Sequence, residues 1–262
     1  MGYETLTFEV TDGVALITLN RPDAANALDK TMAGDLFDVA VRCDCDAAIR
    51  AAVLTANGDM FCAGGDLKSF NSKGEALPQF LTETATMLHN AMIRFQYMDA
   101  PLTVAVNGTA AGAGFSIALS GDHVIAAEGA KFVSAYTASG LTPDGSSTYF
   151  VAKHVGLLRA KELVLTNRVL SAEEACAWGL VNKVVPPEAL MEEAMAVAGR
   201  FAKGPTKALG GAKRLLLTAY SASLESQLEA ETQSISGMAR THDGVHGIKS
   251  FVAKEKPGFR GE

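Results

Sequence analysis

The sequence lacks the features that mark several classes of protein. Only four of its 262 residues are cysteines, and their spacing matches neither a disulfide scaffold nor a common zinc site. The formal net charge is −6, and no basic stripe with interleaved aromatic residues is present, which argues against a nucleic-acid partner. Residues 1–5 form no basic and apolar signal segment, and Phe259–Glu262 carries no peroxisomal or retention tag, so we expect a cytoplasmic location.

One uncharged run, Leu102 to Leu119, has the length of a membrane span. It contains Asn107, Ser116, three glycines and two threonines, which fit a buried strand, a turn and a helix better than a bilayer. We therefore expect no membrane segment. A composition of 48% hydrophobic and 20% charged residues is that of an ordinary globular protein.

The first half of the chain alternates strand-like and helix-like segments, and the part beyond residue 145 is almost entirely helical. Residue periodicity predicts strands over 6–10, 14–19, 51–55, 102–106, 123–127, 132–133 and 181–185, and helices over 26–43, 78–97 and 115–119. Asp12-Gly13 is a strong hairpin turn, and Ser171-Ala-Glu-Glu174 is a capping box that begins a helix. The pattern indicates an α/β fold of repeated β-β-α units followed by a helical C-terminal region.

Two glycine-rich turns each follow an apolar strand and lead into a helix: Phe61-Cys-Ala-Gly-Gly-Asp-Leu67 and Asn107-Gly-Thr-Ala-Ala-Gly-Ala-Gly114. A turn through small residues into a helix start leaves backbone N–H groups without partners and pointing outward. Two such turns side by side aim two donors at one oxygen, which is the geometry of an oxyanion hole. The pair therefore predicts chemistry on a carbonyl group whose oxygen becomes negative.

These turns resemble the motifs of the crotonase superfamily, the enoyl-CoA hydratase/isomerase family. Further matches are Ala24-Ala-Asn-Ala-Leu28, Gly140-Leu-Thr-Pro-Asp-Gly145 and Trp178-Gly-Leu-Val181, in the family's order and over essentially the whole chain. The resemblance implies a crotonase spiral core of β-β-α units over residues 1–200 and a C-terminal helical trimerisation region over 201–262. It also implies an acyl-CoA thioester as substrate, no cofactor or metal besides that coenzyme A, and a homotrimer or a dimer of trimers.

The resemblance places the two oxyanion donors on the backbone N–H groups of Gly65 and Ala113. The residues that it implies for binding the acyl group and its coenzyme A lie in the loops around the glycine turns and in the acyl pocket: Ala24, Ala25, Asn26, Leu28, Ala63, Gly64, Asp66, Leu67, Gly112, Ser116, Tyr136, Leu141 and His89. Phe251 and Lys254 match positions where the family brings an aromatic ring and a lysine toward the nucleotide, in some members from a neighbouring subunit.

The departures from the family pattern decide which reaction we expect. Hydratases of the family use two glutamates to hold and activate water, and the matching positions are Ser116 and Tyr136 here. A serine hydroxyl is no base near neutral pH, so the standard mechanism of water addition is impaired. Asp144 remains, and the family's oxepin-CoA and 3-enoyl-CoA isomerases carry an aspartate at this position as a single proton shuttle. We expect Asp144 to be buried among aromatic and apolar side chains, namely Phe115, Tyr136, Leu141 and Phe150.

Several alternatives stay open. Pro143-Asp-Gly145 is also a plain turn sequence, and the chain could be a hydratase with a non-standard site or a non-catalytic acyl-CoA binder. In the family's 4-chlorobenzoyl-CoA dehalogenases an aspartate at this position is the nucleophile, and a hydrolytic variant of this chain would use Asp144 in the same way. Those enzymes place a tryptophan eight residues earlier and a histidine in the preceding long helix, where this chain has Tyr136 and His89. His242 and His246 have a metal-like spacing but no evident third ligand, so a surface role is expected.

Overall fold

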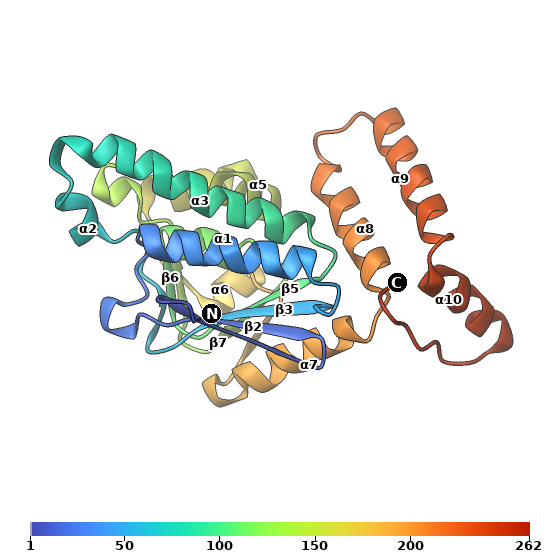
Figure 1. Cartoon of the computed structure of the whole chain (residues 1–262). Coiled ribbons are helices and arrows are strands. Elements are labelled where there is room, and N and C mark those ends of the chain that lie inside the picture. Colours follow the sequence, from blue (N-terminus) through green and yellow to red (C-terminus); the bar gives the residue numbers. More distant parts are fainter. Residues whose placement is uncertain (1) are drawn as a thin grey trace.

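The computed structural model describes residues 2–262 and contains two β-sheets (Figure 1). The strands are β1 (Leu6–Thr11), β2 (Val14–Leu19), β3 (Ala51–Ala56), β4 (Met60–Cys62), β5 (Leu102–Val106), β6 (Thr109–Ala111), β7 (His123–Ala127), β8 (Lys131–Val133), β9 (Leu170–Ser171) and β10 (Lys183–Val185). A six-stranded sheet has the order β1-β2-β3-β5-β7-β10, and a four-stranded sheet has the order β4-β6-β8-β9. In the larger sheet β1 and β2 form an antiparallel hairpin, and the other pairings are parallel.

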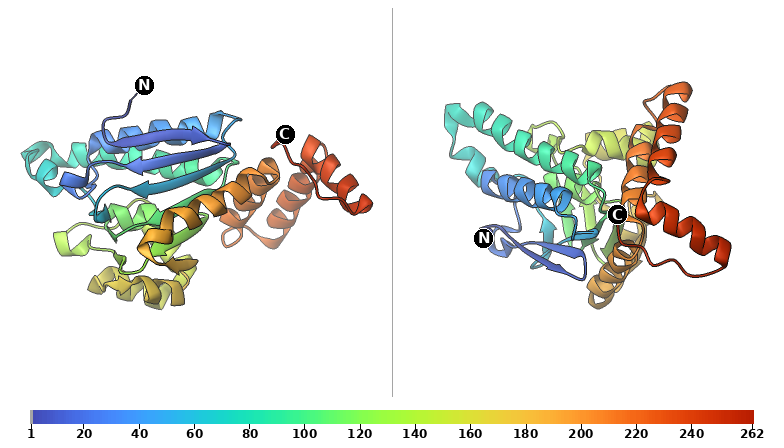
Figure 2. Two further views of the ribbon diagram at one scale, coloured as in Figure 1. Left: turned by 90° about the horizontal axis from the view of Figure 1, so that it is seen from below. Right: turned by 45° about the vertical axis from the view of Figure 1, so that its right-hand side comes forward.

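The helices cover both faces of the larger sheet. They are α1 (Lys30–Cys45), α2 (Leu67–Asn71), α3 (Leu77–Tyr97), α4 (Ala113–Ala118), α5 (Ser147–Thr166), α6 (Ala172–Ala177), α7 (Leu190–Ala202), α8 (Thr206–Thr218), α9 (Leu224–Met238) and α10 (His242–Ala253), with 3-10 turns η1 (Pro22–Ala24), η2 (Gly74–Ala76), η3 (Thr137–Ser139) and η4 (Pro187–Ala189). α1 and α3 pack together on one side of the sheet, and α7 covers the other (Figures 1 and 2).

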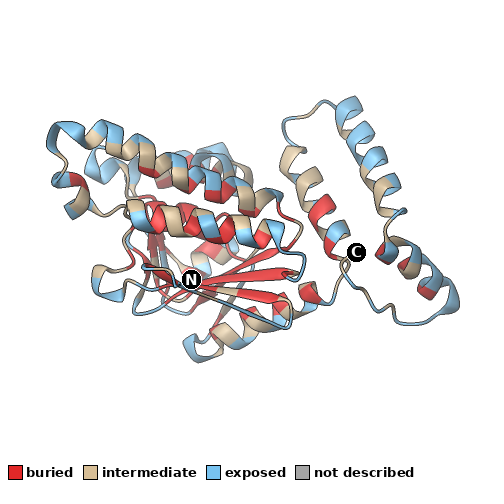
Figure 3. Cartoon of the chain, in the orientation of Figure 1, coloured by how far each residue is buried: buried red, intermediate tan, exposed pale blue. Residues whose placement is uncertain are grey.

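Burial on both faces explains why the central strands read as unbroken apolar runs. Every residue of β3 and β5 is buried, and Figure 3 shows these strands in continuous red. Parallel strands need this composition because helices close both of their faces. The predicted strands at 14–19, 51–55, 102–106 and 123–127 are confirmed to within one residue, and so are the hairpin at Asp12-Gly13 and the capping box at Ser171.

One local prediction was wrong, and most of one sheet was not predicted. The helix predicted from residue 26 begins at Lys30, because the Asp29 side chain accepts a hydrogen bond from the Met32 N–H (2.9 Å) and caps it there. Ala25 and Asn26 both have φ of +51°, a left-handed conformation that cannot belong to an α-helix. Of the second sheet only β8 was predicted, as the strand at 132–133, since β4 and β6 are three residues long and overlap the segments interpreted as turns.

The chain leaves the core after α7, and α8, α9 and α10 extend away from it (Figures 1 and 2). Two ion pairs tie α8 back to the core: Lys213 Nζ lies 2.7 Å from Asp122 Oδ2, and Arg214 lies 2.6 Å from Asp99. No residue of α9 is buried in this chain. Among the described residues, 2–262, no helix has the length and apolar character needed to cross a bilayer.

Asp243, in the first turn of α10, holds the C-terminal end of the chain. Its buried carboxylate accepts hydrogen bonds from the N–H groups of Arg260 (2.8 Å) and Gly261 (2.7 Å). Burial alone would raise the pKa of Asp243, but these hydrogen bonds outweigh it and hold the pKa below its ordinary value of 3.8. The ionised carboxylate therefore stabilises the fold above that ordinary value, and the stabilisation is lost as the pH falls through the lower, folded-state pKa.

We expect Asp243→Asn to lower the free energy of unfolding at pH 7 by about 1.5–3 kcal/mol, because two backbone donors lose a charged acceptor. Glu231→Gln, which neutralises an exposed carboxylate on α9, is the matched control. Denaturant unfolding of both variants measures the effect, and the deficit of Asp243→Asn should shrink as the pH is lowered below 3.8. Equal stability of the two variants at pH 7 would contradict the anchoring role.

Candidate active site

The two glycine-rich turns lie in contact with each other. Gly64 has φ of +99° and Gly112 has φ of +52°, both in the region that favours glycine. A Cβ atom on Gly64 would lie 3.1 Å from the carbonyl oxygen of Ala111, and one on Gly112 would lie 3.3 Å from the Gly64 Cα. Larger residues would push the turns apart, so glycine is required at this crossing.

Pairing with the loop before α1 orients the Gly65 N–H. The Leu28 N–H donates to the Gly64 carbonyl (2.7 Å), and the Asp66 N–H donates to the Leu28 carbonyl (2.9 Å). These bonds form an isolated parallel bridge between Leu28 and Gly65 that uses the groups on either side of Gly65. The N–H of Gly65 itself consequently points away from this loop.

Ala113 supplies a second free N–H, because it is the first residue of α4 and the first donors of a helix have no partner within it. The preceding residue is fixed, since the Gly112 N–H donates to the Val133 carbonyl (3.1 Å). Within residues 2–262 we find no hydrogen bond from the N–H of Gly65 or Ala113. Both residues line one cavity of about 250 Å³, which we call the first cavity.

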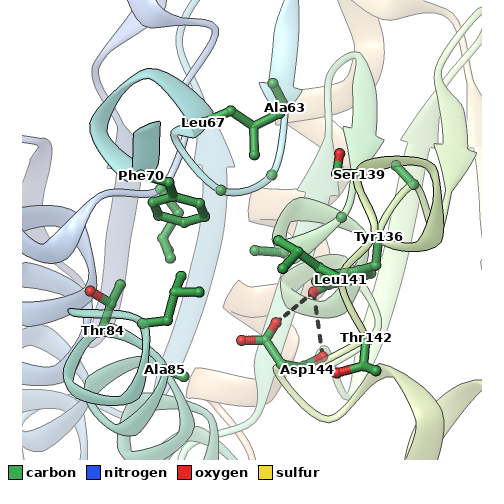
Figure 4. Close-up of a pocket in the computed structure, with 17 residues that line it drawn as sticks. Ala63, Leu67, Phe70, Thr84, Ala85, Tyr136, Ser139, Leu141, Thr142 and Asp144 are labelled. Carbon is green, nitrogen blue, oxygen red and sulfur yellow. Dashed lines mark hydrogen bonds between the residues drawn. The ribbon is translucent and has the colours of Figure 1, made fainter. Parts of the chain in front are cut away.

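Figure 4 shows two walls of the first cavity facing each other. Phe70 of α2 and Ala85 of α3 stand on one side, and Tyr136, Leu141 and Asp144 stand on the other. Apolar side chains dominate the lining, with a few polar groups among them, which is the usual character of a small-molecule site. The arrangement suits an apolar acyl group whose carbonyl reaches the two free amides.

Asp144 meets a different partner on each carboxylate oxygen. The Tyr136 hydroxyl donates to Oδ1 (2.7 Å), and His89 Nε2 lies 3.7 Å from Oδ2. The Gly145 N–H donates to the same His89 nitrogen (3.1 Å), so Nε2 acts as an acceptor in this arrangement. The carboxylate is thus held from one side by a hydroxyl and faced on the other by an imidazole.

The expected burial of Asp144 is wrong in part. Its side chain is 33% exposed, and it lies between the first cavity and a second one of about 600 Å³. Leu141 lines the first cavity, whereas Phe150 and His89 line the second. Phe115 is buried in the hydrophobic core and lines neither cavity.

Tyr136 lines the first cavity, and Ser116 lies behind it. The Ser116 Oγ lies 2.8 Å from the Tyr136 hydroxyl and donates to the Asp144 carbonyl (2.8 Å). Burial, with the nearby Asp144 charge, raises the pKa of Tyr136 well above its usual range, so the hydroxyl stays protonated. Ser116 is completely buried and reaches the cavity only through Tyr136, although we expected it to shape the acyl pocket directly.

The three predicted catalytic residues and about half of the predicted binding residues line the first cavity: Gly65, Ala113 and Asp144, with Leu28, Ala63, Gly64, Leu67, Gly112, Tyr136 and Leu141. The structure places the other residues of the loop 24–28 beside it. Ala24 ends η1, and the Ala25 carbonyl accepts a hydrogen bond from the Ala63 N–H (3.0 Å). The loop and the first glycine turn therefore form one continuous backbone surface.

Asn26 and Asp66 hold these loops with their side chains and do not line the first cavity. Asn26 is fully buried, and its amide donates to the carbonyl groups of Asn57 (2.8 Å) and Met60 (2.9 Å). Asp66 caps α2 and pairs with Arg21 (3.3 Å). Burial would raise the pKa of Asp66, but its hydrogen bonds and the Arg21 charge outweigh this and lower it. Both side chains thus contribute to loop geometry.

Phe251 and Lys254 lie far from the first cavity of their own chain. Phe251 is in the last turn of α10 and Lys254 is its C-cap residue, at the opposite end of the molecule from α2 (Figures 1 and 2). Phe251 is 74% exposed. Two histidines of the same helix have partners within the C-terminal region. His242 contacts Asp243 (3.2 Å), and His246 accepts a hydrogen bond from the Gly258 N–H (3.1 Å).

One wall of the first cavity, which α2 and α3 provide, was not predicted: Phe70, Leu81, Thr84 and Ala85. A signal for part of it was present. Leu81, Ala85 and His89 are spaced by four residues, so they share one face of α3. That face points toward Asp144, because His89 contacts it.

The chain belongs to the enoyl-CoA hydratase/isomerase family, whose family model matches residues 9–262. A probable enoyl-CoA hydratase of Rhodobacter capsulatus is 36% identical over 261 residues, which is 100% of both chains. The 1,2-epoxyphenylacetyl-CoA isomerase of Escherichia coli is 36% identical over 260 residues, 99% of each chain. A solved enoyl-CoA hydratase/isomerase from Mycobacterium abscessus has a TM-score of 0.91 and 34% identity, covering 98% of this chain and 100% of its own. These findings confirm the predicted family and crotonase fold.

We expect Gly64→Ala to destabilise the protein by about 1–3 kcal/mol, through a strained φ and the contact with Ala111, and to lower enoyl-CoA turnover about a hundredfold. Gly129→Ala is the matched control, because Gly129 has φ of +83° but nothing within 4 Å of an added Cβ. Thermal unfolding and steady-state kinetics measure both variants. If Gly64→Ala loses no more activity than Gly129→Ala, contact between the two turns does not set the site geometry.

Proposed function

We propose that the protein is an acyl-CoA isomerase that shifts a double bond through a thioester enolate, with Asp144 as its single proton shuttle. The observation that carries this proposal is that Asp144 lines the same cavity as Gly65 and Ala113, whose N–H groups are free. Asp144 is the one carboxylate among the described residues that line this cavity. One carboxylate suffices to move a proton, whereas the family's hydratases use two to activate water.

The proposed reaction uses groups of this chain alone. The N–H groups of Gly65 and Ala113 bind the thioester carbonyl oxygen and stabilise the negative charge that develops on it. Asp144 removes a proton from C2 or C4 of the acyl group and returns it at the other end of the allylic system, so no atom is gained or lost. Neither a metal nor a redox cofactor takes part in these steps, and coenzyme A enters only with the substrate.

Coenzyme A is proposed to lie along the loop Ala24–Leu28 and the turn Ala63–Leu67. The backbone hydrogen bonds between these segments support this path, because they make one surface that leads to the first cavity. Phe251 and Lys254 are proposed to reach the nucleotide of a neighbouring subunit. Their distance from the cavity of their own chain is what supports this assignment.

We also propose that the protein is cytoplasmic and forms a homotrimer or a dimer of trimers. Apolar side chains are exposed along α9 and α10, which protrude from the core: Leu224, Leu228, Ile235, Ile248, Phe251 and Val252. Such surfaces usually mark an interface. Sedimentation equilibrium is expected to give three or six times the chain mass of 27.4 kDa, and Ile248→Glu is expected to lower it. A monomer at micromolar concentration would contradict this assembly.

One observation favours a second candidate function, a 4-chlorobenzoyl-CoA dehalogenase or a related hydrolase. His89 lies 3.7 Å from Asp144. In such an enzyme the aspartate forms an ester with the substrate, and a nearby base is needed to hydrolyse that ester. However, the His89 nitrogen that faces Asp144 already accepts the Gly145 N–H. This occupied nitrogen favours the isomerase, and release of chloride from 4-chlorobenzoyl-CoA would reverse the preference.

We expect Asp144→Asn to lower the rate of double-bond migration in 3-hexenoyl-CoA by about 10²- to 10⁴-fold, the usual contribution of a general base. Binding of the acyl-CoA should persist, because the two amides remain. The absorbance of the conjugated product measures the rate of migration, and isothermal titration calorimetry measures the binding of the acyl-CoA. Asp12→Asn, at the exposed hairpin turn, is the control.

The same assay separates the alternatives. Efficient hydration of crotonyl-CoA with no migration in 3-hexenoyl-CoA would show a hydratase with a non-standard site. Binding of acyl-CoA by the natural chain without turnover of either substrate or of 4-chlorobenzoyl-CoA would show a non-catalytic binder. Unchanged migration in Asp144→Asn would remove this aspartate from the mechanism.

A further inference from the structure

Ser116, Tyr136 and Asp144 form a chain of hydrogen bonds in the wall of the first cavity, with Ser116 behind the other two. The Tyr136 hydroxyl lies 2.7 Å from Asp144 Oδ1 and 2.8 Å from Ser116 Oγ. Ser116 Oγ also lies 2.8 Å from the carbonyl oxygen of Asp144. Ser116 is fully buried and Tyr136 is half-buried, so the bond between their hydroxyl groups is shielded from water.

The number of available protons fixes the direction of this chain. An ionised carboxylate only accepts, so Tyr136 gives its single hydroxyl proton to Asp144 Oδ1. The Tyr136 oxygen is then free to accept from Ser116, whose one proton is shared with the Asp144 carbonyl. Since burial raises the pKa of Tyr136, its hydroxyl remains a donor throughout the neutral range.

One carboxylate oxygen is left for a substrate. Tyr136 occupies Oδ1, and Figure 4 shows the other oxygen of Asp144 directed into the first cavity, toward the wall that contains Thr84 and Ala85. Among the described residues, the other titratable side chain in contact with this carboxylate is His89, which faces Oδ2 from α3. The two oxygens of Asp144 are therefore not equivalent.

We infer that Tyr136 is a positioning residue that reserves Oδ2 of Asp144 for proton transfer, with Ser116 holding the Tyr136 hydroxyl in line. The inference rests on the proposed isomerase function. The proton of the substrate C–H bond passes to Oδ2, its electron pair remains on the acyl group as the enolate, and the proton returns to the far carbon of the allylic system. Tyr136 keeps its own proton throughout.

Tyr136→Phe tests this role, because it keeps the ring and removes only the donor. We expect the acidic limb of the pH profile of kcat for 3-hexenoyl-CoA migration to move up by about one pH unit, since the ionised carboxylate loses a hydrogen bond. We also expect the plateau of kcat to fall about tenfold with KM nearly unchanged, because the carboxylate is no longer held. Ser116→Ala should shift the limb in the same direction by a smaller amount.

Two controls make the result specific. Tyr3→Phe removes another tyrosine–aspartate hydrogen bond, the one from Tyr3 to Asp38 on the surface, and should leave the profile unchanged. The shift caused by Tyr136→Phe should persist in a His89→Gln background, which removes the other titratable group near Oδ2. Circular dichroism over the same pH range checks that each variant stays folded. If Tyr136→Phe is unfolded, Ser116→Ala is used as the test variant in its place.

Different outcomes overturn different statements. If Tyr136→Phe has the same acidic limb and plateau as the natural chain, the positioning role is wrong and the isomerase function still stands. The same holds for Ser116→Ala if Tyr136→Phe does not fold. Undiminished migration in Asp144→Asn would remove Asp144 from the mechanism, and absence of migration in the natural chain would overturn the isomerase function itself, whatever the Tyr136 variant shows.

Discussion

Contact between two glycine turns is the constraint on which the site depends. Gly64 follows β4 and Gly112 follows β6, and these two strands are parallel neighbours in the smaller sheet. Because parallel strands end at the same edge of their sheet, the turns after them meet there. Glycine at both positions lets the backbones approach to van der Waals distance, and this approach brings the free N–H groups of Gly65 and Ala113 to one cavity.

The second feature that determines the chemistry of the site is the carboxylate of Asp144, whose surroundings are mostly uncharged. Hydroxyl groups stand at positions 116 and 136, so Asp144 has no neighbouring acid to compete with it for a proton in the described part of the site. A hydroxyl donor favours the ionised form of an adjacent carboxylate, whereas a second carboxylate would disfavour it. The hydroxyl groups at positions 116 and 136 therefore support the one carboxylate of this cavity.

The sequence predicted the parts of this architecture that depend on local pattern. Apolar runs located the central strands, and the glycine motifs located the two turns that line the cavity, while the family resemblance supplied the expected donors Gly65 and Ala113. The start of α1 was misplaced, because the left-handed pair Ala25 and Asn26 depends on hydrogen bonds to Asn57 and Met60, which are distant in sequence. The wall from α2 and α3 was missed for the same reason: only tertiary packing shows which face of a helix meets Asp144.

The geometry of Asp144 also supports our proposal that the site catalyses isomerisation and not hydration. Water addition needs a water molecule fixed by two or more contacts, so that its oxygen attacks the correct carbon. Here Tyr136 already occupies Oδ1, and the opposite wall of the cavity is largely apolar, with Phe70, Leu81 and Ala85. A single free oxygen holds a water molecule poorly, but it is all that is needed to accept a proton from a C–H bond and to return it. The donor that positions the carboxylate thus also limits the reactions open to it.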